Sequence, residues 1–399
     1  MKSKKIASDL LYSIFAIGIM NVVLQFVVYP FINRQMGAEV FGQVLFYQGI
    51  IAILAPSFGN ATNNTRLVIY NRDTTKNGDY IFTLLLVSIP ASVISVIVCI
   101  LQHDTVLFSV LFIILVIISI FRNYSSVEYR LTLTYKKQFV FFMVLSVGYL
   151  VGILLFKAVH SWIAIFLLAE AAAVAFVIIF GTIYKQPLVR SKRIKQILKH
   201  VITLSASYLL TNGMLNLDRL VLKYFVGSEA VSEYYVLSLL GKTVAIIGVP
   251  LNSILIGYLT KRETKLTRKP YMKITAAIAA FGVLVFAACC VLTPVFIRII
   301  YPSMVSTVDY SLNTWVCAAQ ILYFLTNILL VVVLTFVEVR WQLIIQGSYA
   351  VLFVILSILM TRTMMIRGFA YAACISSLVY FLMTIIVGLI GSTSILTQK

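Results

Sequence analysis

Long apolar runs follow one another along the whole chain, and short polar segments separate them. A helix needs about 20 apolar residues to cross the hydrocarbon core of a bilayer, and most of these runs reach that length. The pattern therefore predicts twelve membrane-spanning helices and no separate soluble domain. The predicted spans are residues 10–33, 40–60, 80–101, 105–121, 139–157, 160–184, 200–223, 231–258, 272–298, 310–337, 342–361 and 367–390.

The composition excludes a water-soluble fold. Hydrophobic residues make up 61% of the chain and charged residues 11%, whereas a soluble domain is about 45–50% apolar. We therefore predict an all-α integral membrane protein. An even split of the spans gives two six-helix lobes, residues 1–195 and 196–399, around a central cavity.

The net charge of +19 is concentrated between the apolar runs and not along one face. That distribution excludes nucleic acid as the expected partner and fits loops that contact anionic lipid headgroups. If alternate loops are assigned to the cytoplasm, starting at the N-terminus, they carry 24 Lys and Arg, against six in the external loops. The bias predicts that both termini are cytoplasmic.

A short motif occurs once in each half of the chain. Residues 37–42 read GAEVFG and residues 227–232 read GSEAVS, and each motif follows the first predicted helix of its half. Two six-helix halves with this repeat have the same orientation and are related by an axis along the membrane normal. The repeat predicts that the first helix of each half lines the cavity.

The seventh predicted helix carries a polar stripe along one face, with spacings of 3, 4, 4, 3 and 4. Its members are Ser205, Tyr208, Asn212, Asn216, Arg219 and Lys223. A charge at bilayer depth costs roughly 2.5–3.5 kcal/mol on insertion scales, so the stripe faces protein or water. Two interpretations stay open: a wet cationic cavity for an anionic headgroup, and polar contacts between helices.

The first predicted helix has a weaker version of this stripe. Asn21 and Gln25 share a face, and Arg34 follows the outer end of the helix. Together with the seventh helix they define the candidate substrate-binding residues. These are Asn21, Gln25, Arg34, Asn212, Asn216, Arg219, Lys223 and Lys242.

Two carboxylates, Asp218 and Glu170, lie inside predicted spans and are candidates for ion coupling or ion pairing. Asp218 adjoins Arg219 and can pair with it or with another cation. That pair can be functional or structural. Glu170 and Lys242 both fall near mid-membrane, so they can pair across the cavity, or Lys242 can act as a second anion-binding group.

Chemistry other than transport has little support in the sequence. All five cysteines fall inside apolar runs without metal-ligand spacing, and they are interpreted as small buried hydrophobes. Gly-rich nucleotide loops, paired catalytic carboxylates and nucleophile elbows are missing, and the predicted external loops are short. We therefore expect a protein that is not an enzyme and that uses no cofactor and no metal.

The segment 215–240, with Asn216, Asp218, Arg219, Gly227 and Glu229, resembles the junction of the seventh and eighth helices in polysaccharide transporters of the multidrug/oligosaccharidyl-lipid/polysaccharide (MOP) exporter superfamily. Residues 36–42 and Arg66 resemble its N-terminal half. The greatest similarity is to Wzx-type flippases for O-antigen and related repeat units.

The resemblance implies a MATE-like fold in a bacterial inner membrane and a role in lipopolysaccharide or similar polysaccharide biosynthesis. It implies transfer of an undecaprenyl-diphosphate-linked oligosaccharide from the cytoplasmic to the periplasmic leaflet. Its expected partners are that glycan and membrane lipids, and the further candidates are a proton or sodium gradient and polysaccharide polymerase machinery. The alternatives are a cation-coupled multidrug antiporter of the same superfamily and a lipid II flippase, against which the lack of two additional helices counts.

Overall fold

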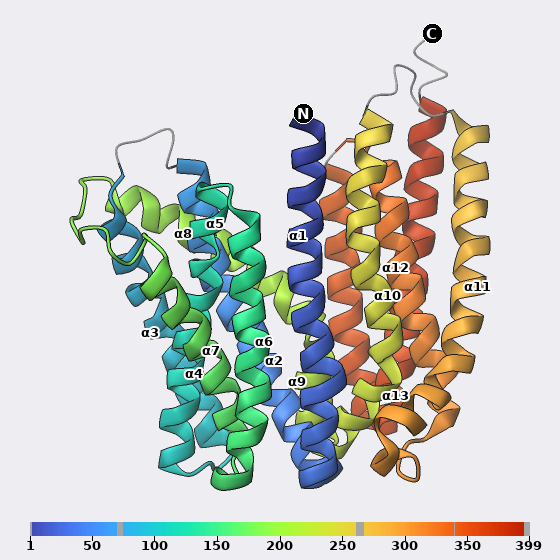
Figure 1. The fold of residues 1–399 in the computed structure, drawn as a ribbon. Coiled ribbons are helices and arrows are strands. Elements are labelled where there is room, and N and C mark those ends of the chain that lie inside the picture. Colours follow the sequence, from blue (N-terminus) through green and yellow to red (C-terminus); the bar gives the residue numbers. More distant parts are fainter. Residues whose placement is uncertain (1, 70–74, 261–266, 339, 395–399) are drawn as a thin grey trace. The chain divides into compact units, whose positions relative to one another are not determined.

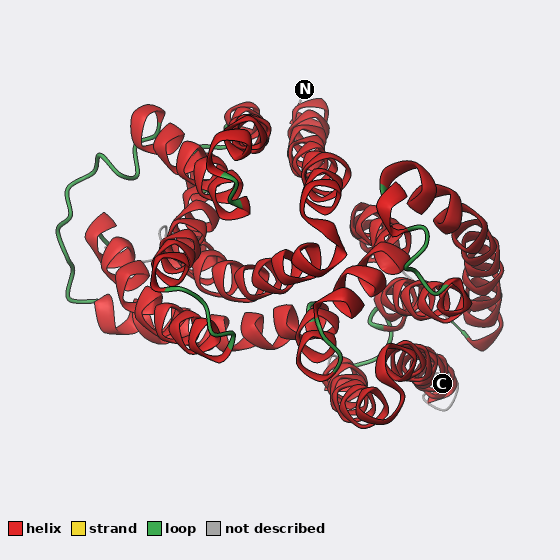
Figure 2. Cartoon of the chain, turned by 90° about the horizontal axis from the view of Figure 1, so that it is seen from below, coloured by secondary structure: helices red, strands yellow, loops and turns green. Residues whose placement is uncertain are grey.

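The computed structural model describes residues 2–69, 75–260, 267–338 and 340–394, and all regular structure in these ranges is helical (Figures 1 and 2). The predicted all-helical membrane class is confirmed. Eight helices in the described ranges are long and apolar enough to cross a membrane. Some cations of the predicted loops lie outside the described residues, namely Arg72, Lys261, Arg262, Lys265 and Lys399.

The chain divides into two compact units, each built from two stretches of sequence. The first unit comprises Met1–Gln35 and Phe46–Asn216, and the second comprises Met36–Leu45 and Leu217–Lys399. The seventh predicted span is therefore shared, since its first part belongs to one unit and its second part to the other. The lobe boundary at residues 195 and 196 stays a prediction.

In the first unit, α6 packs on α7 and α1, α4 packs on α3 and α7, and α8 packs on α3. The elements of this unit are α1 (Lys2–Val23), the π-helix η1 (Leu24–Val28), most of α2 (Tyr29–Ile69), α3 (Asn77–Leu101), α4 (Val106–Ser125), α5 (Val127–Leu131), α6 (Tyr135–Val159), α7 (Trp162–Phe180) and α8 (Ile194–Leu215).

Two local features of the first unit follow directly from its residue types. Pro30 lacks an N–H and its ring crowds the carbonyl of Phe26, and the helix widens into the π-helix η1 at this point. Between α6 and α7, a Cβ added at Gly148 would lie 2.6 Å from the Cα of Ala169. Glycine thus allows the two backbones to approach closely, as small residues do in membrane helix pairs.

In the second unit, α12 packs against α10, α11 and α13, and α9 packs against α10 and α13. A buried apolar cluster that includes Tyr271, Leu329 and Tyr380 lies between these helices. The elements are α9 (Leu217–Phe225), α10 (Ser228–Thr260), α11 (Arg268–Ile300), η2 (Pro302–Met304), η3 (Tyr310–Leu312), α12 (Asn313–Val333) and α13 (Arg340–Ser394).

Each of the twelve predicted spans falls mainly on helical residues, but the ends differ in places. The sixth span is shorter than predicted because α7 ends at Phe180, before Gly181. The break inside α2 lies at Gly37, and the break inside α13 lies at Met365, where φ is 56°. Both breaks fall between predicted spans, so each break separates two consecutive spans that share one helix label.

Each turn of the sequence repeat has a glycine with positive φ. Gly37 has φ 81° and Gly227 has φ 127°, values that L side chains rarely adopt. The segments that follow them meet inside the second unit, where a Cβ added at Gly42 would lie 1.8 Å from the carbonyl oxygen of Ser228. The positive φ at both glycines fits the repeat, and the symmetry axis stays a prediction.

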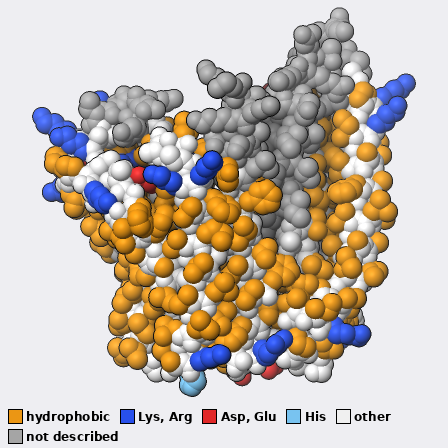
Figure 3. Space-filling view, viewed as in Figure 1, with side chains coloured by type: hydrophobic (Ala, Val, Ile, Leu, Met, Phe, Trp, Pro, Cys, Tyr) orange, Lys and Arg blue, Asp and Glu red, His pale blue; other side chains and the backbone are white. Residues whose placement is uncertain are grey.

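The surface of the first unit has the character of a membrane protein. Large apolar side chains cover the middle of α3, α4 and α6, and Lys and Arg gather at the ends of these helices (Figure 3). Since a bilayer core excludes charge and favours apolar side chains, this distribution fits a multi-pass membrane protein.

Candidate functional site

The polar stripe of the seventh predicted span is broken in the middle. Helix α8 ends at Leu215, Asn216 caps it, and α9 starts at Leu217. The residues before the break lie in the first unit, and Asp218, Arg219 and Lys223 lie in the second. The stripe therefore forms two sets of contacts.

The part of the stripe on α8 makes polar contacts with α2. The amide of Asn212 donates to the hydroxyl of Ser57 at 3.0 Å, and Asn64 donates to the hydroxyl of Tyr208 at 2.6 Å. Asn216 donates to the backbone carbonyl of Asn212 at 2.9 Å. This half of the stripe thus includes the contacts between helices that one of the two sequence interpretations predicts.

The part of the stripe on α9 is cationic. The guanidinium of Arg219 lies 5.7 Å from the ring centroid of Tyr235, and its Nη1 donates to the carbonyl oxygen of Leu45 at 3.4 Å. The ammonium of Lys223 donates to the hydroxyl of Ser228 at 2.7 Å. The two groups that contact Arg219 are neutral, so they hold this cation in place without cancelling its charge.

Asp218 is buried and pairs with Lys242, whose Nζ lies 2.5 Å from its Oδ2. The sequence leaves two partners open for Asp218, either Arg219 or another cation. In the structure the partner is the other cation, Lys242. Adjacent residues on a helix point about 100° apart, so Asp218 and Arg219 face different neighbours. The other carboxylate oxygen of Asp218, Oδ1, is buried and has no hydrogen-bond partner among the described residues.

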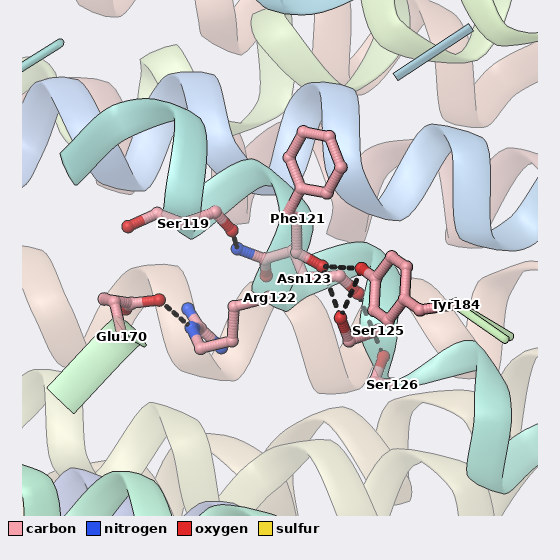
Figure 4. Close-up of polar contacts among 8 residues, drawn as sticks. All are labelled: Ser119, Phe121, Arg122, Asn123, Ser125, Ser126, Glu170 and Tyr184. Atoms are coloured by element: carbon pink, nitrogen blue, oxygen red, sulfur yellow. Dashed lines mark hydrogen bonds and ion pairs between the residues drawn. The ribbon is translucent and has the colours of Figure 1, made fainter. Parts of the chain in front are cut away.

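Glu170 pairs with Arg122 and not with Lys242, which corrects the second ion-pair hypothesis. Figure 4 shows the Arg122 side chain, in the last turn of α4, reaching the carboxylate of Glu170 in the middle of α7. The sequence places Arg122 in a cytoplasmic segment because it follows an apolar run. It is instead part of that run, since α4 continues to Ser125.

The three candidates on and after the first predicted helix differ in their surroundings. Asn21 donates to the carbonyl of Ile17, one turn earlier on its own helix, at 2.9 Å. Gln25 lies in the π-helix, and Arg34 is exposed. These three residues belong to the first unit, whereas Arg219, Lys223 and Lys242 belong to the second.

One polar cluster of the first unit, centred on Arg66, contains no residue of the polar stripe. Arg66, which is 1% exposed, donates to Asn77 Oδ1 at 2.8 Å and to the hydroxyl of Tyr124. Its other terminal nitrogen donates to Gln186 at 3.3 Å. The family resemblance at Arg66 is the only sequence signal for this cluster, because the partners of Arg66 come from three other segments.

Arg130 lies near the same helices, although the sequence places it in a loop. Arg130, on α5, donates to Asn64 Oδ1 at 3.0 Å and to Asn63 Oδ1 at 3.3 Å. Through Asn64 it is connected to Tyr208 of the polar stripe. The pair of asparagines just past the second predicted span is a weak signal for this cluster, and nothing in the sequence joins it to Arg130.

No protein-family model matches the sequence, and no curated protein matches it either. Solved structures do resemble the chain. The lipid II flippase MurJ in an inward closed conformation aligns with a TM-score of 0.73 and 14% identity, over 97% of this chain and 91% of that chain.

Two transporters give a similar result. An inward-facing multidrug resistance MATE family transporter of the MOP superfamily has a TM-score of 0.62 and 14% identity, over 94% of this chain and 95% of that chain. A MATE transporter from Vibrio cholerae has a TM-score of 0.61 and 12% identity, over 99% and 97%. These neighbours are membrane transporters and flippases, not enzymes, and the chain has the fold that they share, that of the MOP superfamily.

Proposed function

We propose that this chain is a flippase, which moves an undecaprenyl-diphosphate-linked oligosaccharide repeat unit of O-antigen or a similar surface polysaccharide from the cytoplasmic to the periplasmic leaflet. Alternating access of a central cavity is the proposed mechanism. The observation that carries the proposal is the cationic face of α9, where neutral groups hold Arg219 and Lys223 lies one turn further along.

The charges on α9 and α10 favour an anionic substrate. The carboxylate of Asp218 is matched by the ammonium of Lys242 at 2.5 Å, so that pair adds no net charge. Arg219, whose contacts with Leu45 and Tyr235 come from neutral groups, then makes this part of the second unit positive. A diphosphate carries the complementary charge, and an arginine fork can bind two of its oxygens at once. Lys242 then neutralises Asp218, and it can bind the substrate only if the Asp218–Lys242 ion pair opens.

The breaks in the helices support a mechanism in which the two units move as bodies. The boundary between Asn216 and Leu217 coincides with the break between α8 and α9, and the boundary after Gln35 lies two residues before the break at Gly37. Breaks of this kind are where membrane transporters absorb changes in backbone conformation. The likeness to MurJ, a flippase by its name, adds to this support.

The test replaces each cation of α9 by a neutral side chain in the host that expresses the protein. Arg219→Gln and Lys223→Gln should each abolish or strongly reduce surface polysaccharide, and lipid-linked repeat units should accumulate inside the cell. The matched control is Arg298→Gln, since Arg298 is an exposed cation of the same unit. Membrane levels of all three variants are measured by immunoblot. Normal surface polysaccharide in both α9 variants would overturn the proposal.

A cation-coupled multidrug antiporter is the second candidate, and the fold shared with MATE transporters favours it. Such an antiporter needs a carboxylate that can bind a cation. Glu170 is paired with Arg122, and Asp218 is paired with Lys242 through one oxygen. Resistance to several cationic dyes that is lost in Asp218→Asn or Glu170→Gln would favour this candidate over flipping.

Lipid II is a third possible substrate, because it is also linked to a polyprenyl diphosphate and MurJ is named for it. A complementation experiment separates it from an oligosaccharide repeat unit. If the chain sustains growth of cells depleted of MurJ, lipid II is the substrate. If it restores surface polysaccharide to a strain that lacks its flippase, a repeat unit is the substrate. Neighbouring genes for glycosyltransferases and a polymerase would favour the repeat unit.

A further inference from the structure

Arg130 is held in a fixed position by two amide oxygens of α2. Its Nη1 donates to Asn64 Oδ1 at 3.0 Å and to Asn63 Oδ1 at 3.3 Å. Because a guanidinium can only donate hydrogen bonds, it faces the oxygen of each amide. The amide nitrogens donate elsewhere, Asn63 to the hydroxyl of Ser126 at 2.8 Å and Asn64 to the hydroxyl of Tyr208 at 2.6 Å.

The two amides that position Arg130 are themselves neutral. No carboxylate of the described residues forms an ion pair with it, in contrast to Arg122 eight residues earlier, which pairs with Glu170. Arg130 is exposed, whereas the guanidinium of Arg122 is mostly covered. An exposed guanidinium held by neutral groups suits phosphate binding, because its fork matches two phosphate oxygens.

The position of Arg130 in the first unit fits a phosphate at the membrane surface. Helix α5 lies at the end of this unit where α1, α3 and α8 begin (Figure 1). Lys and Arg side chains gather at that end (Figure 3). The distribution of Lys and Arg predicts that this end faces the cytoplasm. Phosphates of the inner leaflet are found at that depth.

The neighbours of Arg130 continue into a face that suits sugars. Asn64 and Tyr208 join it to the stripe on α8, and Asn212 lies one helical turn beyond Tyr208. Amide and hydroxyl groups in a row can exchange hydrogen bonds with the hydroxyls of a glycan. A phosphate at Arg130 would thus place an attached glycan beside this row.

We propose that Arg130, oriented by Asn63 and Asn64, is a phosphate-ester site at the cytoplasmic end of the first unit, and that it engages the diphosphate of the lipid-linked substrate before translocation. This inference rests on the proposed flippase function. The same chemistry would bind the phosphate of an anionic phospholipid. The experiment therefore needs one arm for each source.

The test measures binding to the full-length protein in nanodiscs. In the first arm, the discs contain only phosphatidylcholine, and undecaprenyl diphosphate is added, with undecaprenol as the uncharged reference. In the second arm, native mass spectrometry counts the phosphatidylglycerol molecules retained from mixed discs.

Three variants are compared with the wild-type protein in both arms. Arg130→Gln removes the charge. Asn64→Asp keeps the size of the side chain and places a carboxylate against the guanidinium, and the Tyr208 hydroxyl can donate to it. Arg190→Gln is the control, an exposed arginine of the same unit that lies 4.8 Å from the ring centroid of Phe82.

We expect Arg130→Gln and Asn64→Asp each to weaken undecaprenyl diphosphate binding about tenfold or more, since a charged hydrogen-bond pair is lost. Undecaprenol binding and the Arg190→Gln control should stay unchanged. If the variants lose only phosphatidylglycerol retention, the site binds a phospholipid. That result would support phosphate binding at Arg130 and reject its role in substrate binding. If the wild-type protein binds undecaprenyl diphosphate and neither variant changes either arm, the assignment of Arg130 is wrong and the proposed function stands. If the wild-type protein does not bind it, the proposed function is wrong.

Discussion

Asp218 and Lys242 lie 24 residues apart on consecutive helices, and their side chains meet at 2.5 Å to form a largely buried ion pair. Both charges lie in the second unit, where α9 packs on α10. The pair therefore connects the part of the polar stripe that carries Arg219 to the helix behind it. This relationship gives the two residues a role in holding the cationic face in place.

The first prediction concerns this pair. Lys242→Met should leave the carboxylate of Asp218 buried without a partner, which costs about 3–5 kcal/mol in comparable buried pairs. We expect a lower melting temperature in detergent, measured by intrinsic fluorescence. The double variant Asp218→Asn with Lys242→Met should recover most of the loss, because neither charge remains. A double variant that melts no higher than Lys242→Met would show that the carboxylate is not the cause.

The second prediction concerns the contact between the two repeat segments. A Cβ at Gly42 would lie 1.8 Å from the backbone oxygen of Ser228, and neither backbone can easily shift. Gly42→Ala should therefore destabilise the second unit by about 1–3 kcal/mol or more. Gly213→Ala is the matched control, since nothing lies within 4 Å of its Cβ and alanine is the better helix former. The check compares the amounts of folded protein in fluorescence-detected size exclusion. Equal amounts of the two variants would contradict the close approach.

The third prediction concerns the ring under Arg219. Tyr235→Phe keeps an aromatic face 5.7 Å from the guanidinium, whereas Tyr235→Leu removes it. The cation–π contact contributes about 0.5–2 kcal/mol. We expect surface polysaccharide close to the wild-type level with Phe and a clear reduction with Leu, at equal amounts of protein in the membrane. Equal polysaccharide levels in both variants would show that the ring does not position Arg219.

The helices of this protein could be predicted from the sequence because their signal is local. An apolar run of about 20 residues marks each span whatever it packs against, and the left-handed glycines Gly37 and Gly227 mark two of the turns. The errors in the predicted spans lie at the ends of the helices. Arg122 looked like a loop residue because charge usually ends a span, but the carboxylate of Glu170, 48 residues later, lets α4 continue past it.

The partners within the candidate site could not be predicted because they depend on which helices meet. The spacing along the seventh span predicted a single polar face, but spacing cannot show that α8 ends at Leu215 and divides the stripe. It also cannot show that Lys242 faces Asp218 and that Arg130 faces Asn64. A pattern along one helix gives the direction of a side chain, and the neighbouring helix decides its partner.

The last prediction concerns Arg66, which connects three helices and a connecting segment in the first unit. Its guanidinium donates to Asn77 of α3, Tyr124 of α4 and Gln186 of the segment that follows α7. A lysine keeps the charge but has a single nitrogen, so it cannot reach these three acceptors in the same geometry. Arg66→Lys should therefore release the segment between α7 and α8, although the net charge is unchanged.

Trypsin provides the measurement, because this segment contains the exposed cleavage sites Lys185, Arg190 and Lys192. We expect Arg66→Lys to be cut there several times faster than the wild-type protein in detergent, with the fragments identified by mass spectrometry. Arg298→Lys, at an exposed position of the second unit, should be cut at the wild-type rate. An unchanged rate in Arg66→Lys would mean that other contacts hold the segment. Those contacts would be the backbone N–H groups of Thr182 and Ile183 on the carboxylate of Glu128, at 3.1 and 3.0 Å.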